Sequence, residues 1–236
     1  MPDATIFDDP TRSYCYLSRV VRYRRVPGPG GQAGARFAVL TNEGEAMALE
    51  IRFVAPEAVR VRCRRVADGP LRGDASEPAE QVSVEVREGR VVVRSRALEL
   101  RVVRRPFHYG VFDFDGRKLL VQQIGDVTPT RLVSLPLGYS RDAGGRIAFH
   151  ESFEREPGER LQCQAAAGAT NPSYSSSRGY GVFLNHARAD FELGSASPIT
   201  VSFRVDEPHL DYVVVFGKDG DEIMARYAET GGRATA

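Results

Sequence analysis

Apolar and polar residues alternate through most of this chain of 236 residues. In one run, Met47, Leu49 and Ile51 fall on one side of an extended backbone and the residues between them fall on the other. Successive side chains of a β-strand point to opposite faces, so this period of two predicts half-buried antiparallel strands. Similar runs lie at 59–64, 82–87, 98–102 and 199–205. We therefore predict an all-β fold, an antiparallel two-sheet β-sandwich over 13–217 within a single domain, 1–236.

One short helix is predicted at the C-terminal end, over 219–230. Asp219 is a suitable N-cap, and Ile223, Met224 and Tyr227 form one apolar stripe on the helix surface. The pair Gly231-Gly232 is expected to end the helix. The chain is thus expected to close with a helix that packs one face against the sandwich.

The stretch 176–194 is predicted to form a β-hairpin. An apolar run ends at Leu184, Asn185-His186 breaks the pattern, and apolar and acidic residues alternate again over 189–193. Gly179 and Gly181 flank Tyr180, which predicts either a positive φ or a close approach of two backbones at these glycines.

The charge balance excludes some classes of function. Lys and Arg total 32 against 31 Asp and Glu, a net charge of +1. Dedicated nucleic-acid and membrane-surface proteins rely on a strong positive field, so neither partner is expected. No apolar run approaches the roughly 20 residues of a membrane-spanning helix. The acidic, Pro-containing N-terminus does not resemble a secretory signal, so we predict a cytoplasmic protein.

The three cysteines, Cys15, Cys63 and Cys163, are widely spaced. An odd number at this spacing predicts neither a disulfide framework nor a metal site. No sequence motif indicates a cofactor, and none is predicted.

The segment 162–177 differs from the rest because it carries no charged residue. Its small, polar residues predict a solvated linker that crosses between two strands. A carboxylate-based active site cannot be built from it.

Five pieces of the chain, in this order, resemble the N-terminal domain of family 31 glycoside hydrolases, the α-glucosidases and α-xylosidases. The last piece ends a strand in Phe-Gly, continues into an acidic helix cap and closes with Tyr-x-x-Thr-Gly. The pieces are 50–62 (EIRFVAPEAVRVR), 106–116 (PFHYGVFDFDG), 149–160 (FHESFEREPGER), 176–186 (SSRGYGVFLNH) and 210–232 (LDYVVVFGKDGDEIMARYAETGG).

This resemblance implies a galactose mutarotase-like sandwich packed beside a catalytic (β/α)8 barrel that carries both catalytic aspartates. The family places no catalytic residue in this domain, so none is predicted here, and the 219–230 helix is expected to lead toward such a barrel. In the family, a longer segment that reaches the sugar pocket stands where this chain has 162–177. The expected role is to support the barrel and its pocket, with α-glycosides as substrates of the parent. The surface that meets the barrel is expected to be apolar, so the isolated chain is expected to self-associate.

Two other functions stay open, a free-standing carbohydrate-binding sandwich and a mutarotase-like aldose epimerase. An epimerase needs an acid and a base on one substrate, but His150 and Glu151 are adjacent and should point to opposite faces. His108, His186 and His209 lie near turns or strand ends, as surface or capping groups do.

Sugar rings stack on aromatic faces, and the chain has no Trp, which leaves Tyr109, Tyr174, Tyr180 and Tyr212 as candidates. The residues predicted to contact sugar are Tyr174, Tyr180, Asn185 and His186.

An arginine row occupies one strand at Arg60, Arg62, Arg64 and Arg65. Acidic residues at Glu50, Glu85 and Glu99 are available on other strands. The row therefore predicts a solvated strand face with cross-strand ion pairs rather than a phosphate site.

Overall fold

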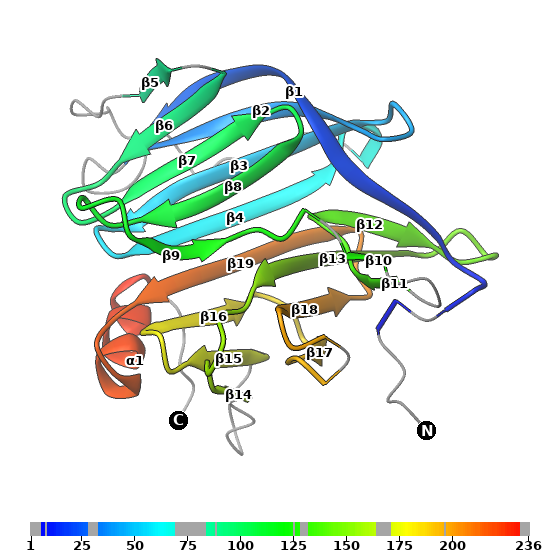
Figure 1. Ribbon diagram of the computed structural model, residues 1–236. Helices are drawn as coiled ribbons and strands as arrows, with labels where there is room; N and C mark the ends of the chain where they lie inside the picture. Colours follow the sequence, from blue (N-terminus) through cyan, green and yellow to red (C-terminus); the bar gives the residue numbers. More distant parts are fainter. Residues whose placement is uncertain are drawn as a thin grey trace.

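The fold is seen in a computed structural model (Figure 1). It describes residues 6–7, 9–27, 33–68, 84–87, 89–124, 126–127, 132–163, 171–195 and 197–231, of which 27, 33, 84–87, 126–127 and 132–133 are described by their backbone alone.

Within these residues, twelve strands form one continuous sheet and five form another, and every pairing between strands is antiparallel. The first part of the continuous sheet, called here the first sheet, runs in the order β14 (Leu161–Cys163), β15 (Ser173–Ser176), β16 (Tyr180–Leu184), β19 (His209–Phe216), β4 (Ala58–Arg65), β3 (Ala46–Ala55), β2 (Ala33–Thr41) and β1 (Ser13–Pro27). It continues from β1 into the second sheet, β12 (Gly138–Arg141), β13 (Ile147–Glu154), β18 (Thr200–Val205) and β17 (Asp190–Glu192).

The separate third sheet contains β5 (Val84–Arg87), β6 (Arg90–Arg94), β7 (Glu99–Arg104), β8 (Phe107–Phe112) and β9 (Lys118–Val121). A short pair, β10 (Asp126–Val127) and β11 (Leu132–Ser134), and the 3₁₀ turn η2 (Val66–Asp68) complete the strand region. The helix α1 spans Gly220–Glu229.

The long strand β1 belongs to both parts of the continuous sheet. Its first residues pair with β12, from Ser13 opposite Arg141 to Tyr16 opposite Gly138. From Leu17 onward it pairs with β2, with irregular register up to Arg22. β1 therefore carries the chain from one layer to the other, as Figure 1 shows for the blue strand.

The first sheet packs its inner face against both other sheets. In the third sheet, Tyr109 contacts Tyr212 of the first sheet through their hydroxyl groups. In the second sheet, the ring of Phe203 lies 5.3 Å from that of Tyr212, at an interplanar angle of 78°. The inner residues of the three sheets form one continuous buried core. The predicted two-layer all-β fold with one C-terminal helix is confirmed.

The helix α1 covers part of the outer face of the first sheet, as the apolar stripe predicts. Asp219 caps it, since its side chain accepts a hydrogen bond from the N–H of Glu222 at 2.9 Å. Ile223 is buried, and the ring of Tyr227 stacks on Phe183 at 3.8 Å. These contacts bury both faces of the neighbouring strands, which explains the apolar run of β19.

Two glycines make this packing possible: Gly179 shows the predicted positive φ and close backbone approach, whereas Gly181 lies against side chains. Gly179 has a φ of +84°, and a Cβ there would lie 2.4 Å from the carbonyl oxygen of Gly217. A Cβ on Gly181 would lie 2.8 Å from Cγ2 of Ile223, so the glycine gives Ile223 of the helix room to pack directly on the sheet.

Two predictions about connections are wrong. The stretch 176–194 is not a hairpin, because β16 pairs with β15 and β19 whereas β17 pairs with β18 in the second sheet. The chain leaves the first sheet after Leu184 and crosses to the other layer. The segment 162–177 is not only a linker, since β14 and β15 at its two ends pair with each other; the residues between them, 164–170, lie outside the described part of the chain.

We expect Gly179→Ala to destabilise the fold by at least about 2 kcal/mol, because it forces a non-glycine residue to a positive φ and against a backbone oxygen. Urea unfolding measures the change. The matched control is Gly220→Ala at the start of α1, where nothing lies within 4 Å of the added Cβ and alanine favours the helix. Equal stability of the two variants would contradict this account of the turn.

Candidate functional site

The two tyrosines predicted to contact sugar lie in the core. Tyr174 and Tyr180 are both 0% exposed, and their rings meet edge to face 6.3 Å apart. The hydroxyl of Tyr180 donates a 2.7 Å hydrogen bond to Oε1 of Glu159, which is itself buried. Because neither ring has a face open to solvent, neither can stack on a sugar in this fold. The sugar-binding prediction for these two residues is therefore not supported.

Asn185 and His186 brace the end of β16 against β19. The amide of Asn185 donates to Oδ1 of Asp211 at 2.9 Å, and the same carboxylate accepts two bonds from Arg60, at 2.9 and 2.6 Å. Nε2 of His186 accepts a 2.9 Å hydrogen bond from the backbone N–H of Asp211. His186 is thus a capping group, as its place at a strand end suggests, but it is buried rather than on the surface.

One group of side chains has the composition of a metal site. Ligand atoms of His186, Glu207 and His209 all lie within 4.8 Å of one another. The ring of His186 accepts a backbone N–H at Nε2, so the proton of the neutral ring sits on Nδ1, the atom that faces Oε2 of Glu207 at 3.1 Å. A metal needs an unprotonated nitrogen, and a metal-bound histidine normally donates through its other nitrogen. This geometry therefore favours a histidine–carboxylate contact over a metal centre.

The two residues considered for epimerase chemistry point to opposite sides of β13, as predicted. His150 packs against the rings of Phe7 and Tyr14, and burial lowers the pKa of this histidine to about 3. Glu151 points the other way, into the core. The pair cannot act on one substrate.

Glu151 forms a polar cluster that the sequence did not indicate. Its Oε2 accepts hydrogen bonds from the hydroxyls of Tyr109 and Tyr212, each at 3.0 Å. Its Oε1 accepts from the side chain of Gln122 at 3.0 Å and from the N–H of Ser152 at 2.9 Å. Burial raises the pKa of Glu151 to about 7, although these four donors act in the opposite direction.

A carboxyl group with such a raised pKa is often catalytic. Glu151 is 0% exposed, however, and both of its oxygens are occupied by protein donors. A substrate has no route to it in this fold, so its role is to join the three sheets.

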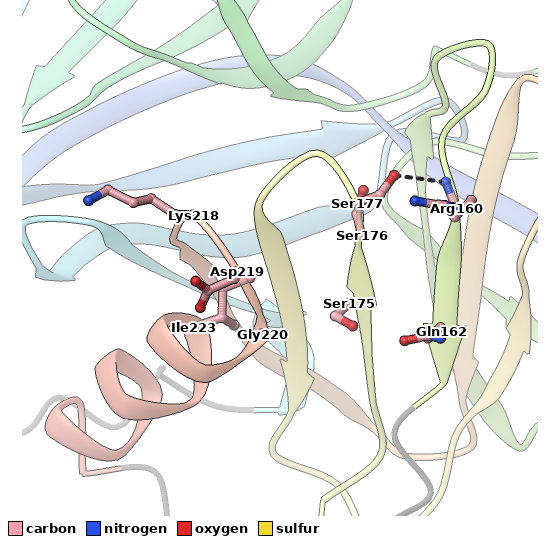
Figure 2. A pocket seen from close by; sticks show the side chains of 9 residues that line it. All are labelled: Arg160, Gln162, Ser175, Ser176, Ser177, Lys218, Asp219, Gly220 and Ile223. Atoms are coloured by element: carbon pink, nitrogen blue, oxygen red, sulfur yellow. Dashed lines mark hydrogen bonds between the residues drawn. The ribbon is translucent and has the colours of Figure 1, made fainter.

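An open hollow of about 380 Å³ lies between α1 and the strands β14 and β15 (Figure 2). Asp219 is the single carboxylate among the described residues that line it, and this side chain already caps α1. A glycosidase needs two carboxyl groups on either side of the bond that it cleaves, and this hollow does not provide them. Its other polar lining residues are Arg160, Gln162, Ser175, Ser176, Ser177 and Lys218.

The arginine row forms the cross-strand ion pairs that the sequence predicts, although with partly different partners. Arg62 pairs with Glu50 across the strands, and Arg60 pairs with Asp211. Glu99 belongs to the third sheet and pairs with Arg94 and Arg101 instead. The side chain of Glu85 lies outside the described part of the chain.

No family model matches the chain. A segment of 62 residues, 26% of the chain, is 39% identical to the alpha-xylosidase XylQ of Lactiplantibacillus pentosus and spans 8% of that protein. A segment of 63 residues, also 26% of the chain, is 40% identical to an alpha-xylosidase of Emericella nidulans, again over 8% of the relative.

The fold resembles parts of solved enzymes. The chain matches the cycloalternan-forming enzyme of Listeria monocytogenes with a TM-score of 0.74 and 18% identity, over 95% of this chain and 23% of the enzyme. It matches a GH31 dextranase of Flavobacterium johnsoniae with a TM-score of 0.64 and 17% identity, over 91% of this chain and 28% of the enzyme. The chain is thus similar to family 31 glycoside hydrolases, in fold over most of its length and in sequence over about a quarter of it.

The chain thus spans about a quarter of the solved enzymes that it matches and 8% of the curated alpha-xylosidases. Among the described residues, α1 is the one α-helix, and neither its length nor its apolar character suits it to crossing a membrane. The side-chain partners of Tyr180 and Glu151 could not be found from the sequence, because each lies 21 or more residues away along the chain.

The cluster at Glu151 makes stability depend on pH. With a pKa near 7 when folded and 4.5 as the ordinary value, Glu151 keeps a proton in the folded state that the unfolded chain releases. Its stabilising contribution is present below pH 4.5 and is lost as the pH rises through 7. Glu151→Gln keeps the shape of the side chain but does not titrate. The unfolding free energy of this variant, relative to that of the wild type, should therefore rise by about 2 to 3 kcal/mol from pH 5 to pH 8.

Urea unfolding of both proteins across this range measures the difference in their unfolding free energies. The contributions of His150 and of the other titrating groups are common to both proteins and cancel in this difference. Glu154→Gln, on the same strand but paired at the surface with Lys118, is the matched control and should change stability by less than about 1 kcal/mol. A Glu151→Gln difference that does not vary with pH would refute the raised pKa.

Proposed function

We propose that this chain acts as the non-catalytic N-terminal domain of a family 31-like α-glycosidase, an α-glucosidase or α-xylosidase. It supports a catalytic barrel and forms part of the wall of the sugar pocket. The observation that carries the proposal is a fold match over 95% of this chain that occupies 23% of a much longer enzyme. The identity to two alpha-xylosidases favours an α-xyloside or α-glucoside as the substrate of the parent.

The buried acidic side chains are held by hydrogen bonds from other residues of the chain, which supports a structural role for this domain. Glu50, Glu151 and Glu159 are buried, and each accepts hydrogen bonds from protein donors. Asp211 is held in the same way by Arg60 and Asn185. Carboxylates committed in this manner are not free to serve as nucleophile or acid in glycoside hydrolysis.

We also propose that the protein lies in the cytoplasm and that an exposed surface of the domain contacts the barrel. All three cysteines are free thiols, which the reducing cytosol maintains. Exposed apolar side chains such as Phe114 and Ile199, at 58% and 52% exposure, are candidates for contacts with the rest of the enzyme or with a second copy.

We expect the purified chain to leave p-nitrophenyl α-xyloside and α-glucoside unhydrolysed, because the described residues place no free carboxyl pair at the hollow of Figure 2. Release of p-nitrophenol at 405 nm measures turnover, and a chain denatured by heat is the blank. Hydrolysis that a single substitution in this chain abolishes would show that the domain is catalytic.

Two measurements separate the alternatives. Saturable, millimolar or tighter binding of xylose, glucose or maltose in titration calorimetry would favour a free-standing sugar-binding sandwich. Faster mutarotation of α-glucose in polarimetry, lost in Glu151→Gln, would favour an epimerase. The proposed scaffold role predicts neither result.

A further inference from the structure

Positive charge is concentrated in the first part of the chain. Residues 13–65 contain ten arginines and four glutamates, a net charge of +6. Since the whole chain carries +1, the rest carries −5. Such an uneven distribution of charge within one domain indicates an interaction surface and says nothing about the fold.

Strand register places these arginines side by side on one face. In one row across the sheet, Arg24 lies opposite Arg36, Arg36 opposite Glu50, and Glu50 opposite Arg62. Directly opposite residues share a face of the sheet. Since Phe37, Leu49 and Val61 fill the inner face, these side chains lie on the outer face of β1–β4. The neighbouring rows add Arg22, Arg64, Arg52 and Arg60.

Two carboxylates are built into this outer face. Glu50 is 2% exposed and accepts hydrogen bonds from Arg36 and Arg62, while Asp211 of β19 holds Arg60. Among the described residues, seven arginines against these two acids leave a net charge of +5 on the face. The acids fix the orientation of the central guanidinium groups but do not neutralise the surface.

At the β1 side of the face, Arg22 and Arg24 are exposed, and neither forms an ion pair or hydrogen bond within the described residues. Between them and β3 lies an apolar hollow of about 180 Å³. It exists because Ala38 and Ala48, which face each other across β2 and β3, interrupt a surface of long arginine side chains. Val66, 50% exposed, forms one side.

The combination of charge and hollow identifies the kind of partner. Guanidinium groups pair with carboxylates, and a hollow of this size accepts one apolar side chain. A second copy cannot bind through the same face, since both carry +5. A phosphate backbone offers nothing to fill the hollow, and the two fixed carboxylates repel it.

We propose that the outer face of β1–β4 docks an acidic segment of another protein, with one apolar side chain in the hollow at Ala38 and Ala48. The inference goes beyond the proposed scaffold role and does not rest on it. Carboxylates on either side of the apolar residue contact Arg22, Arg24 and Arg36, which line the same hollow.

Fluorescence anisotropy with a fluorescein-labelled peptide, in which one Leu lies between pairs of Glu, tests this docking. We expect saturable binding in 50 mM NaCl that weakens as salt is added. The double variant R22E/R24E should bind at least tenfold more weakly. The control R90E/R117E makes the same charge change at two exposed arginines of the third sheet and its β8–β9 turn and should change affinity less than threefold.

The hollow is tested separately with Ala38→Leu, which fills it. This variant should bind the Leu peptide at least fivefold more weakly than the wild type, and should bind a peptide with Ser in place of Leu as the wild type does. Circular dichroism checks that each variant is folded. Absence of peptide binding to the wild type, or equal effects of R22E/R24E and R90E/R117E, would overturn the proposal. So would an oligothymidylate of twenty residues that binds more tightly than the peptide through the same arginines.

Discussion

The fold depends on burying one carboxyl group at the junction of three sheets. Glu151 comes from the second sheet, Tyr109 from the third and Tyr212 from the first, and their polar atoms meet in the core. A buried polar group without a partner costs stability, so the first and third sheets have to supply their donors, and the second sheet its acceptor, in the correct place. Apolar side chains can fill a core in several arrangements, whereas this cluster accepts one. It therefore sets how the sheets sit on one another.

The sequence predicts individual elements well and their neighbours poorly. Alternation identifies the inner face of β3, and the stripe from Ile223 to Tyr227 identifies the docked face of α1, because both are local properties of the chain. A period of two says which face a residue takes but not which strand lies beside it, so β16 and β17 look like a hairpin although they lie in different sheets. Only the hydrogen-bonded pairing of the strands reveals that the chain crosses from one sheet to the other between β16 and β17.

The predicted site residues show the same limit. Tyr180 has the aromatic ring that stacking on a sugar needs. Its hydrogen bond to the distant Glu159 shows that its hydroxyl is instead a buried donor. His186 lies at a strand end as expected, but its role comes from the backbone of Asp211, 25 residues later. These polar side chains appear available in the sequence but are used inside the molecule, whereas arginines gather on the outer face of β1–β4.

The sharing of β1 between two layers has a consequence for biosynthesis. Its C-terminal part can pair with β2 as soon as Thr41 has been made, but Ser13–Tyr16 find their partners only when Gly138–Arg141 leave the ribosome. Until then the nascent protein displays an unfinished strand with open hydrogen-bonding groups, a state that invites aggregation. Because long-range pairing of this kind is slow, Ser13–Tyr16 settle well after the neighbouring pairing of β1 with β2 has formed.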